Sequence, residues 1–428
     1  MPATPYPASD SPAPSPIGRR LPELPATVAY WLMAAIIGLS LFASSTPSPL
    51  YATYRAEWGF SSFALTAVFA TYAFGVLAAL LVAGRISDDV GRRPVIVGSL
   101  VALLLATGLF LVADSVGWLF AARGLQGVAT GVAMGAAGAA LLDLHPRRDS
   151  HSAGLANGVS STAGMGFGAL IAAVIVEYGP APMRAPYVVL LAIFAVLLVG
   201  ALLMPEPVGE RRRLSLRLEA PTVPREIRRA FLLSSLGVLA SWSIGGLFMS
   251  LGPQLAAIEL DTDNHLAGGA AILALCGAGS VSQLVFQRVA PWRLTAVGAL
   301  VLAIGMAAVI GSLSLGSASV FLAAAVLMGL GWGTAFLGAL RSLTAVIPAA
   351  SRASTMSAFY VVAYASLSLP ALGAGLVVGD WGLLPTFRVV GGLVVVTGLV
   401  VAVASWRTRP AAARAAEPRA TAALPAID

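Results

Sequence analysis

Lysine is missing from this sequence of 428 residues, and all 26 basic residues are arginine. The phosphate-binding loop of ATP-driven pumps requires a lysine, and so does an enzyme that forms a Schiff base with its substrate. The absence therefore argues against ATP-driven pumping and against Schiff-base chemistry by this chain alone.

Cysteine and histidine are also scarce. The single cysteine, Cys276, lies in an apolar run, so no intramolecular disulfide can form. Three histidines, His145, His151 and His265, lie in or beside polar loops, with no paired acid or cysteine nearby that would make a metal or nucleophile constellation. We therefore predict no metal site, no cofactor and no enzymatic activity.

Charge of either sign is sparse, at 11% of the residues, whereas 58% are hydrophobic. In ordinary soluble domains about 25% of the residues are charged and about 45–50% are hydrophobic. The apolar residues lie in blocks of about twenty, the length that a helix needs to cross a hydrocarbon layer of about 30 Å. Because these blocks are too long for the strands of a membrane β-barrel, we predict an all-α integral membrane protein in the lipid bilayer.

Six blocks precede the long polar segment 205–230, and six follow it. The predicted spans are 27–46, 62–82, 94–113, 118–142, 153–175, 186–204, 231–255, 267–286, 294–313, 318–340, 355–378 and 384–405. A shift of 202 residues pairs Gly127 with Gly329 and Gly131 with Gly333, which is suggestive of an internal repeat. We therefore predict two pseudo-symmetric six-helix bundles, 27–204 and 231–405, a cytoplasmic linker 205–230, a disordered cytoplasmic tail 1–26 and a cytoplasmic tail 406–428.

The arginines are distributed unevenly among the loops. Arg123 falls in the interior of a predicted span. Arg55 and Arg184 fall in one set of alternate loops, and Arg388 lies on the same side, at the start of the last span, while all others lie on the opposite side with the two termini. The positive-inside rule then predicts an even number of spans in the inner (plasma) membrane, with both termini cytoplasmic. Since the arginines form no single patch, we expect no nucleic-acid partner.

The loop between the second and third spans reads Gly-Arg-Ile-Ser-Asp-Asp-Val-Gly-Arg-Arg-Pro over 84–94. It resembles the signature of the major facilitator superfamily, although Asp89 stands where that family usually has a basic residue. The resemblance implies the twelve-helix major facilitator fold, in which Asp88 contacts the start of the eleventh helix and the loop switches between conformations. The implied switch residues are Gly84, Asp88, Gly91, Arg92 and Arg93.

Arg123 stands alone within the fourth span. Such a charge costs about 2.5–3.5 kcal/mol in lipid, so its side chain should either face protein or water, or extend to the outer interface. Arg123, Gln126 and Gly127 are similar to a helix-4 pattern in the same family, and in proton-coupled relatives this implies a proton relay. In the fifth span, Gly164 and Gly168 resemble, imperfectly, a pattern of antiporters, but close helix packing explains them equally well.

No acidic residue falls in the middle third of a predicted span. An organic cation would find no buried counter-charge, so we predict a neutral, lipophilic or mildly polar substrate, or an anion attracted by Arg123. The candidates for lining a central cavity are Tyr30, Ser40, Trp242, Ser243, Gln254, Gln283, Trp332, Thr334, Tyr360, Tyr364 and Ser366.

The leading hypothesis is a monomeric secondary transporter that exports a hydrophobic or mildly polar small molecule by alternating access. Its motifs resemble the twelve-span drug/proton antiporter branch most closely, which implies proton-coupled antiport. Two alternatives stay open: an importer or facilitator of a neutral solute such as a sugar, and a non-transporting membrane receptor or lipid-handling protein.

Overall fold

The computed structural model describes residues 23–83, 86–208 and 221–409, and all regular structure in these ranges is helical. Twelve helices are long and apolar enough to cross a membrane, which confirms the predicted fold class. They are α1 (Ala26–Ser45), α3 (Ser62–Ala83), α5 (Arg92–Leu111), α6 (Val116–Leu144), α7 (Ser150–Tyr178), α8 (Ala185–Leu203), α9 (Arg228–Ser250), α11 (Leu266–Val285), α12 (Pro291–Leu315), α13 (Ala318–Thr344), α14 (Arg352–Trp381) and α15 (Leu383–Arg407). The tail 1–22, the linker segment 209–220 and the tail 410–428 lie outside the described residues.

Three short helices connect the spans: α2 (Tyr51–Trp58), α4 (Ile86–Val90) and α10 (Gly252–Glu259). The chain also forms 3₁₀ turns at Arg225–Ile227 and Ala349–Ser351. The prediction that the seventh span runs to residue 255 is wrong, because α9 ends at Ser250 and Pro253 lies in the first turn of a new helix. Gln254 consequently lies in α10 and not in a span.

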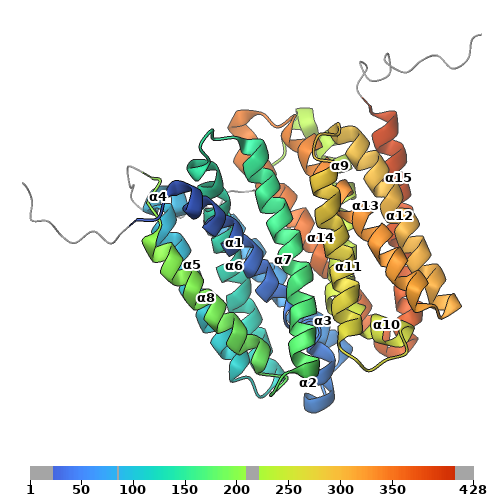
Figure 1. Ribbon diagram of the computed structural model, residues 1–428. Coiled ribbons are helices and arrows are strands. Elements are labelled where there is room, and N and C mark those ends of the chain that lie inside the picture. The colour runs from blue at the N-terminus through green and yellow to red at the C-terminus, as the bar shows by residue number, and fades with distance from the viewer. Residues whose placement is uncertain (1–22, 84–85, 209–220, 410–428) are drawn as a thin grey trace, which may run out of the picture.

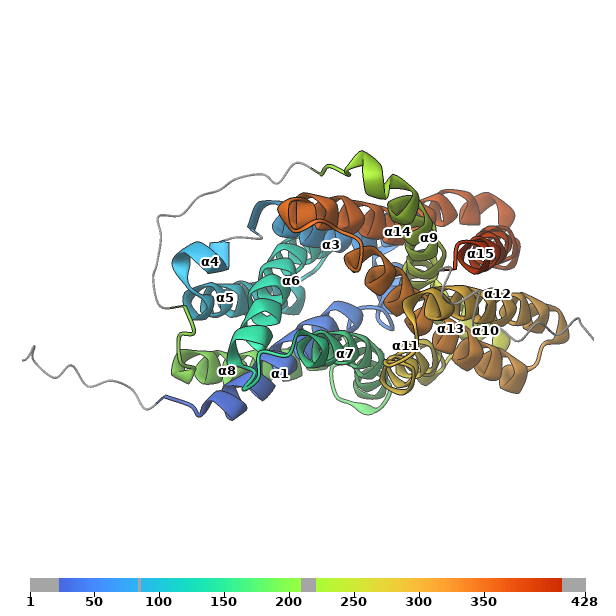
Figure 2. The ribbon, with the colours of Figure 1, turned by 90° about the horizontal axis from the view of Figure 1, so that it is seen from above.

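The helices form two groups placed side by side (Figure 1), α1 to α8 in one and α9 to α15 in the other. Helix α7 packs against α11 and α3 packs against α14, so these two pairs form the interface between the groups. Seen from above, the helices of both groups surround a central region (Figure 2). We call the groups the first and second bundles.

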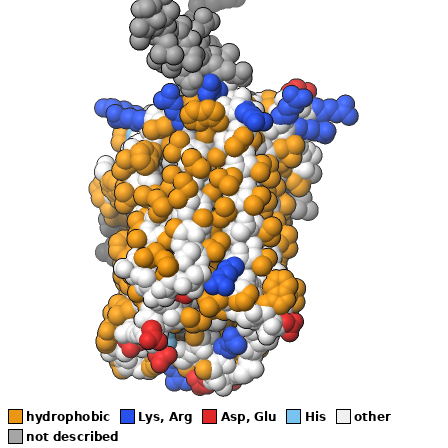
Figure 3. Space-filling view, turned by 90° about the vertical axis from the view of Figure 1, so that its right-hand side faces the viewer, with side chains coloured by type: hydrophobic (Ala, Val, Ile, Leu, Met, Phe, Trp, Pro, Cys, Tyr) orange, Lys and Arg blue, Asp and Glu red, His pale blue; other side chains and the backbone are white. Residues whose placement is uncertain are grey.

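Helix α1 begins and α15 ends at the same face of the molecule, which also carries α4 (Figure 1). We call it the α4 face, and the opposite one the α2–α10 face. In Figure 3 a broad apolar band covers one side of the molecule, with mainly basic side chains along its upper edge and a mixture of acidic and basic ones toward its lower edge. This is the surface of a multi-pass membrane protein.

A similar close glycine contact occurs within each bundle. On α6, Gly127 lies against the backbone carbonyl of Tyr72 in α3, and a side chain there would overlap it. On α13, Gly329 abuts the carbonyl of Leu275 in α11 in the same way. The fourth and tenth spans, α6 and α13, thus pack on the second and eighth spans, α3 and α11, through glycines that are 202 positions apart in sequence. Small residues at these places allow the close approach.

Helix α7 starts three residues before the predicted span because Asp149 caps it. The carboxylate accepts hydrogen bonds from the backbone N–H groups of His151 at 3.1 Å and Ser152 at 3.2 Å. The Ser152 hydroxyl also donates to this carboxylate, and these hydrogen bonds hold the pKa of Asp149 below its usual range. Further along, Gly164 and Gly168 abut Gly38 and Phe42 of α1, so both glycines serve close helix packing.

Candidate functional site: a cavity between the bundles

A cavity of about 330 Å³ lies between the two bundles. Side chains of α1, α3, α6 and α7 form one wall and those of α9, α11, α13 and α14 form the other. The lining residues are Leu41, Ser44, Phe69, Tyr72, Leu80, Met134, Gly135, Gly154, Asn157, Gly158, Ser161, Thr162, Met165, Trp242, Gly245, Met249, Gln283, Trp332, Phe336, Leu340, Tyr360, Tyr364 and Leu367.

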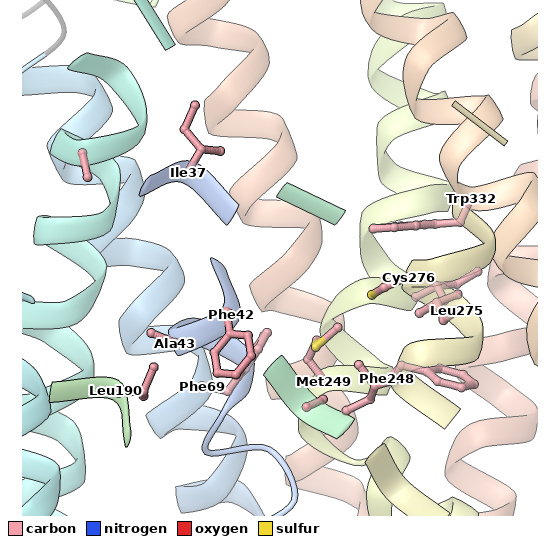
Figure 4. Close-up of a cluster of buried hydrophobic side chains, with 14 of the residues drawn as sticks. Ile37, Phe42, Ala43, Phe69, Leu190, Phe248, Met249, Leu275, Cys276 and Trp332 are labelled. Carbon is pink, nitrogen blue, oxygen red and sulfur yellow. The ribbon is translucent and has the colours of Figure 1, made fainter. Parts of the chain in front are cut away.

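The cavity is closed toward the α2–α10 face. Every residue of 41–51 in the first bundle and of 243–252 in the second is buried there. Phe42 and Phe69 belong to the same buried cluster as Phe248 and Met249 of the other bundle, as Figure 4 shows. Apolar packing across the interface therefore forms the floor of the cavity.

In the opposite direction the lining reaches the ends of the helices at the α4 face. Leu80 lies three residues before the end of α3, and Leu340 four residues before the end of α13. Gly154 lies within the first turns of α7, which starts at this face. The cavity therefore extends toward the α4 face.

The wall is aromatic and uncharged. Trp242 and Tyr364 meet edge to face with ring centres 5.1 Å apart, and Tyr72 packs in the same cluster as Tyr364. The amides of Asn157 and Gln283 are the polar groups with the most hydrogen-bonding capacity in the wall. Within the described ranges, no acidic or basic residue lines the cavity.

Among the predicted cavity residues, the aromatic and amide side chains of Trp242, Gln283, Trp332, Tyr360 and Tyr364 line the cavity. These residues come from four helices of the second bundle, far apart in the sequence. The structure thus brings together one wall of the predicted site.

The predicted hydroxyl residues do not line it. The hydroxyls of Ser40 and Ser366 each donate to the carbonyl four residues earlier at 2.7 Å, and that of Ser243 does so at 2.6 Å. Thr334 binds the carbonyl of Leu330 in the same way. A hydroxyl can satisfy itself on its own helix, so its presence in a span does not indicate a cavity.

Two further candidates lie elsewhere. Tyr30 packs against Trp31 and His145, away from the cavity lining. Gln254 lies in α10, beyond the end of α9.

Sequence reasoning missed the whole of the first bundle's wall, since neither Tyr30 nor Ser40 lines the cavity. Asn157 and Met165 on α7 and Tyr72 on α3 line the cavity. Asn157 could have been predicted to line the cavity. A serine hydroxyl readily bonds to the backbone carbonyl one turn earlier on its own helix, and the longer amide of an asparagine in an apolar span has no equally short bond of this kind. Met165 carries no such signal.

Arg123 is fully buried within the first bundle. Its Nη1 donates to the Ser44 carbonyl at 2.7 Å and to Oε1 of Gln126 at 2.8 Å, and its Nε donates to the Tyr51 hydroxyl at 2.9 Å. The alternative that the side chain extends to the outer interface is therefore wrong. Tyr51, in the unpredicted helix α2, was missed as its partner.

The Arg123 guanidinium stands directly behind the cavity wall. Its central carbon lies 5.2 Å from the centre of the Tyr72 ring, and both Tyr72 and Ser44 line the cavity. The hydrogen-bond partners of Arg123 in the described chain are uncharged. A buried charge without a carboxylate partner gives this part of the wall a positive potential.

The predicted switch motif forms a charge network, except for Gly84, which lies outside the described residues. Arg92 bridges two helices, with Nη1 at 2.5 Å from Asp88 of α4 and Nε at 3.0 Å from Asp143 of α6. The Glu206 carboxylate accepts from the backbone N–H groups of Arg92 at 2.9 Å and Arg93 at 3.1 Å. An acid at the start of α5 stabilises this helix end.

Gly91 is required by this arrangement. Its φ is +111°, and a side chain would place a carbon 2.6 Å from Oε2 of Glu206. The acid comes from the linker, 113 positions beyond Arg93, so the motif's own sequence could not reveal it.

Asp88 pairs with Arg92 of its own bundle, and no hydrogen bond or ion pair among the described residues joins it to α14. The contact that the resemblance implied, with the start of the eleventh span, is therefore not among those formed in this structure. The cavity extends toward this same face.

Polar side chains join the bundles at the α4 face through His151 and Gln287, 3.2 Å apart, and more extensively at the α2–α10 face. Nδ1 of His265, at the start of α11, lies 3.0 Å from Oε2 of Glu177 in α7. Nε2 of the same ring lies 3.1 Å from the Thr53 hydroxyl in α2. The expectation that no acid accompanies the histidines is wrong for His265, although the described residues contain no group of three or more potential metal ligands.

Twelve membrane-spanning helices in two bundles, around a cavity closed at one face and extending to the other, define a transporter. The chain belongs to the Major Facilitator Superfamily, whose sequence profile matches residues 33–369. It is also similar to a protein of Corynebacterium glutamicum named "Gentisate transporter", with 32% identity over 132 residues. This match covers 31% of the chain and 28% of that relative, far less than two thirds of its length. Membership in a family of transporters is consistent with the prediction that the chain is not an enzyme.

Proposed function

We propose that this transporter exports a small aromatic molecule, neutral or singly anionic, by alternating access coupled to protons. The observation that carries the proposal is the cavity wall, in which aromatic rings and two amides occur without a carboxylate. Such a wall suits a ring with a few polar substituents and offers no counter-charge to a cation.

Orientation supports export. By the positive-inside rule the α4 face, where α1 begins and α15 ends, is cytoplasmic, and we place the protein in the plasma membrane. The cavity extends toward this face, so a molecule from the cytoplasm can enter it.

The named relative supports the anionic alternative. Gentisate is a dihydroxybenzoate, which carries one carboxylate on one ring. In this chain the positive Arg123 behind Tyr72 and Ser44 would favour such an anion over an organic cation of the same size.

Proton coupling rests on the resemblance of Arg123, Gln126 and Gly127 to the family's helix-4 pattern. The geometry is compatible with a relay, because Arg123 donates to the Tyr51 hydroxyl and Gln126 donates to the carbonyl of Ala43 at 3.0 Å. These hydrogen-bonded groups lie one layer behind the cavity.

Everted membrane vesicles from cells that express the full chain test the proposal. We expect vesicles energised by a proton gradient to accumulate radiolabelled hydroxybenzoate or benzyl alcohol, and an uncoupler to abolish accumulation. Benzylamine should not accumulate. Flux that is unchanged by the uncoupler would contradict proton coupling. Binding of these compounds without flux of any of them would contradict transport.

A further inference from the structure

Gln283 has an amide without a hydrogen bond in the wall of the cavity. Its side chain is 4% exposed, and it lines the cavity from α11. No group among the described residues hydrogen-bonds to either atom of this amide. A polar group buried in this way is expected to have a partner, and here the space in front of it is the cavity.

Gly158 provides the room for this amide. A side-chain carbon at position 158 of α7 would lie 2.6 Å from Oε1 of Gln283. Gly154, one turn earlier on the same helix, also lines the cavity, but a carbon there would meet no atom within 4 Å. The missing side chain at 158 therefore has a specific consequence: it lets the Gln283 amide extend from the second bundle to the first.

The ring of Trp332 packs between two helices of the same bundle and also lines the cavity. Its six-membered edge lies against Gly279 of α11, one turn from Gln283, whereas a side-chain carbon at Gly245 of α9 would lie 3.9 Å from Nε1. Nε1 is buried and has no hydrogen-bond partner among the described residues. Figure 4 shows the Trp332 ring extending from the second bundle toward the centre of the molecule.

The Gln283 amide can bind an acceptor. It offers N–H donors beside its own carbonyl oxygen, and the aromatic rings of Trp242, Trp332 and Tyr364 stand in the same wall. No acid competes for the donors, and Arg123 lies behind the opposite wall. An oxygen-rich group can accept hydrogen bonds from the donors, and an aromatic ring that carries it can pack against the aromatic wall.

We propose that the amide of Gln283, in the space left by Gly158 and next to the ring of Trp332, is a hydrogen-bond subsite for the carboxylate of an aromatic acid. The inference rests on the proposed function and narrows its substrate class from aromatic molecules in general to aromatic carboxylates. Because Gln283 and Gly158 belong to different bundles, the carboxylate is bound where the bundles meet.

The test is binding of 4-hydroxybenzoate, benzamide and benzylamine to the purified full-length protein, measured by tryptophan fluorescence. We expect 4-hydroxybenzoate to bind the unaltered protein and Gly154→Ala equally well. Gly158→Ala and Gln283→Leu should each weaken it at least about tenfold, the loss expected for a hydrogen bond to a charged group. Gln283→Glu should weaken it further and improve benzylamine binding, a change of preference that a merely structural residue would not produce.

Unchanged affinity for 4-hydroxybenzoate in Gln283→Leu and Gln283→Glu would overturn the subsite. Equal losses in Gly154→Ala and Gly158→Ala would also overturn it, because the effect would then not depend on the space for Gln283. Vesicle transport separates this failure from that of the proposed function: aromatic molecules would still be transported if only the subsite were wrong.

Discussion

Arg123 places a full charge in the interior of the first bundle, and Tyr51 is one of the groups that make this tolerable. Tyr51 and Tyr54 are equally buried on α2, but they have different partners. The Tyr51 hydroxyl accepts from Arg123, whereas the Tyr54 hydroxyl donates to that of Tyr187 at 3.0 Å. The two tyrosines therefore offer a matched comparison at the scale of single residues.

Tyr51→Phe should destabilise the protein more than Tyr54→Phe. The first change leaves guanidinium donors without an acceptor and should cost about 1.5–3 kcal/mol, while the second removes a neutral hydrogen bond of about 0.5–1.5 kcal/mol. Thermal unfolding of both variants in the same detergent measures the difference. Equal melting temperatures would mean that Arg123 does not depend on this hydroxyl.

Individual cavity residues were best predicted where the side chain does not bond to its own helix. Trp242, Tyr360 and Gln283 lie at the cavity as predicted, although Tyr30 does not. Ser243 and Ser366 bind carbonyls one turn earlier, so the same reasoning failed for them. The hydrogen bond between Arg123 and Tyr51 joins residues 72 positions apart, and no pattern in the sequence indicated it.

At the scale of elements, glycines decide how closely the helices approach. Gly127 and Gly135 lie two turns apart on α6. A side chain at 127 would overlap the backbone of α3, whereas one at 135 would meet no atom within 4 Å. The first glycine is thus a contact and the second is not.

Gly127→Ala should lower the free energy of unfolding by about 1–3 kcal/mol, because α3 must move away from α6. Gly135→Ala should be neutral or stabilising by up to about 1 kcal/mol, because alanine favours the helix. Both are measured by thermal unfolding. A larger loss in Gly135→Ala than in Gly127→Ala would contradict the packing described for these helices.

The twelve spans were predictable because apolar length alone determines them in lipid. Short elements were not: α2 and α10 lie at the ends of spans, where Pro47, Pro49 and Pro253 signal interruptions without showing that a helix resumes. The pairing of α7 with α11 and of α3 with α14 is a tertiary feature, for which the sequence offered only the family resemblance.

At the scale of the whole molecule, the two faces differ in how the bundles are joined. At the α2–α10 face, His265 of the second bundle contacts Glu177 and Thr53 of the first, and apolar packing closes the cavity. At the α4 face an exposed contact between His151 and Gln287 at 3.2 Å joins the bundles, and the cavity extends toward this face. The contact at His265 should therefore favour the conformation described here over one that opens to the α2–α10 face.

Glu177→Ala should increase opening at the α2–α10 face. A cysteine introduced by Met249→Cys, in a protein that also carries Cys276→Ser, reports this opening. Met249 suits the purpose because it is only 5% exposed, at the cavity floor. Labelling by a membrane-impermeant maleimide from that side should be about fivefold faster, which corresponds to about 1 kcal/mol of lost contact energy. Glu57→Ala, an exposed acid on the same face, is the control. The same labelling rate in all three proteins would show that the His265 contact does not hold this face closed.

Alternating access is the central claim, and distances between spin labels on opposite bundles test it most directly. One pair replaces Arg147 and Arg352 at the α4 face, and the other replaces Asp114 and Asp380 at the α2–α10 face; all four are exposed. The account predicts two populations for each pair, with the first distance shortening and the second lengthening in the same molecules when conditions favour the alternative state. A single, invariant distance at both faces, in membranes that transport substrate, would contradict it.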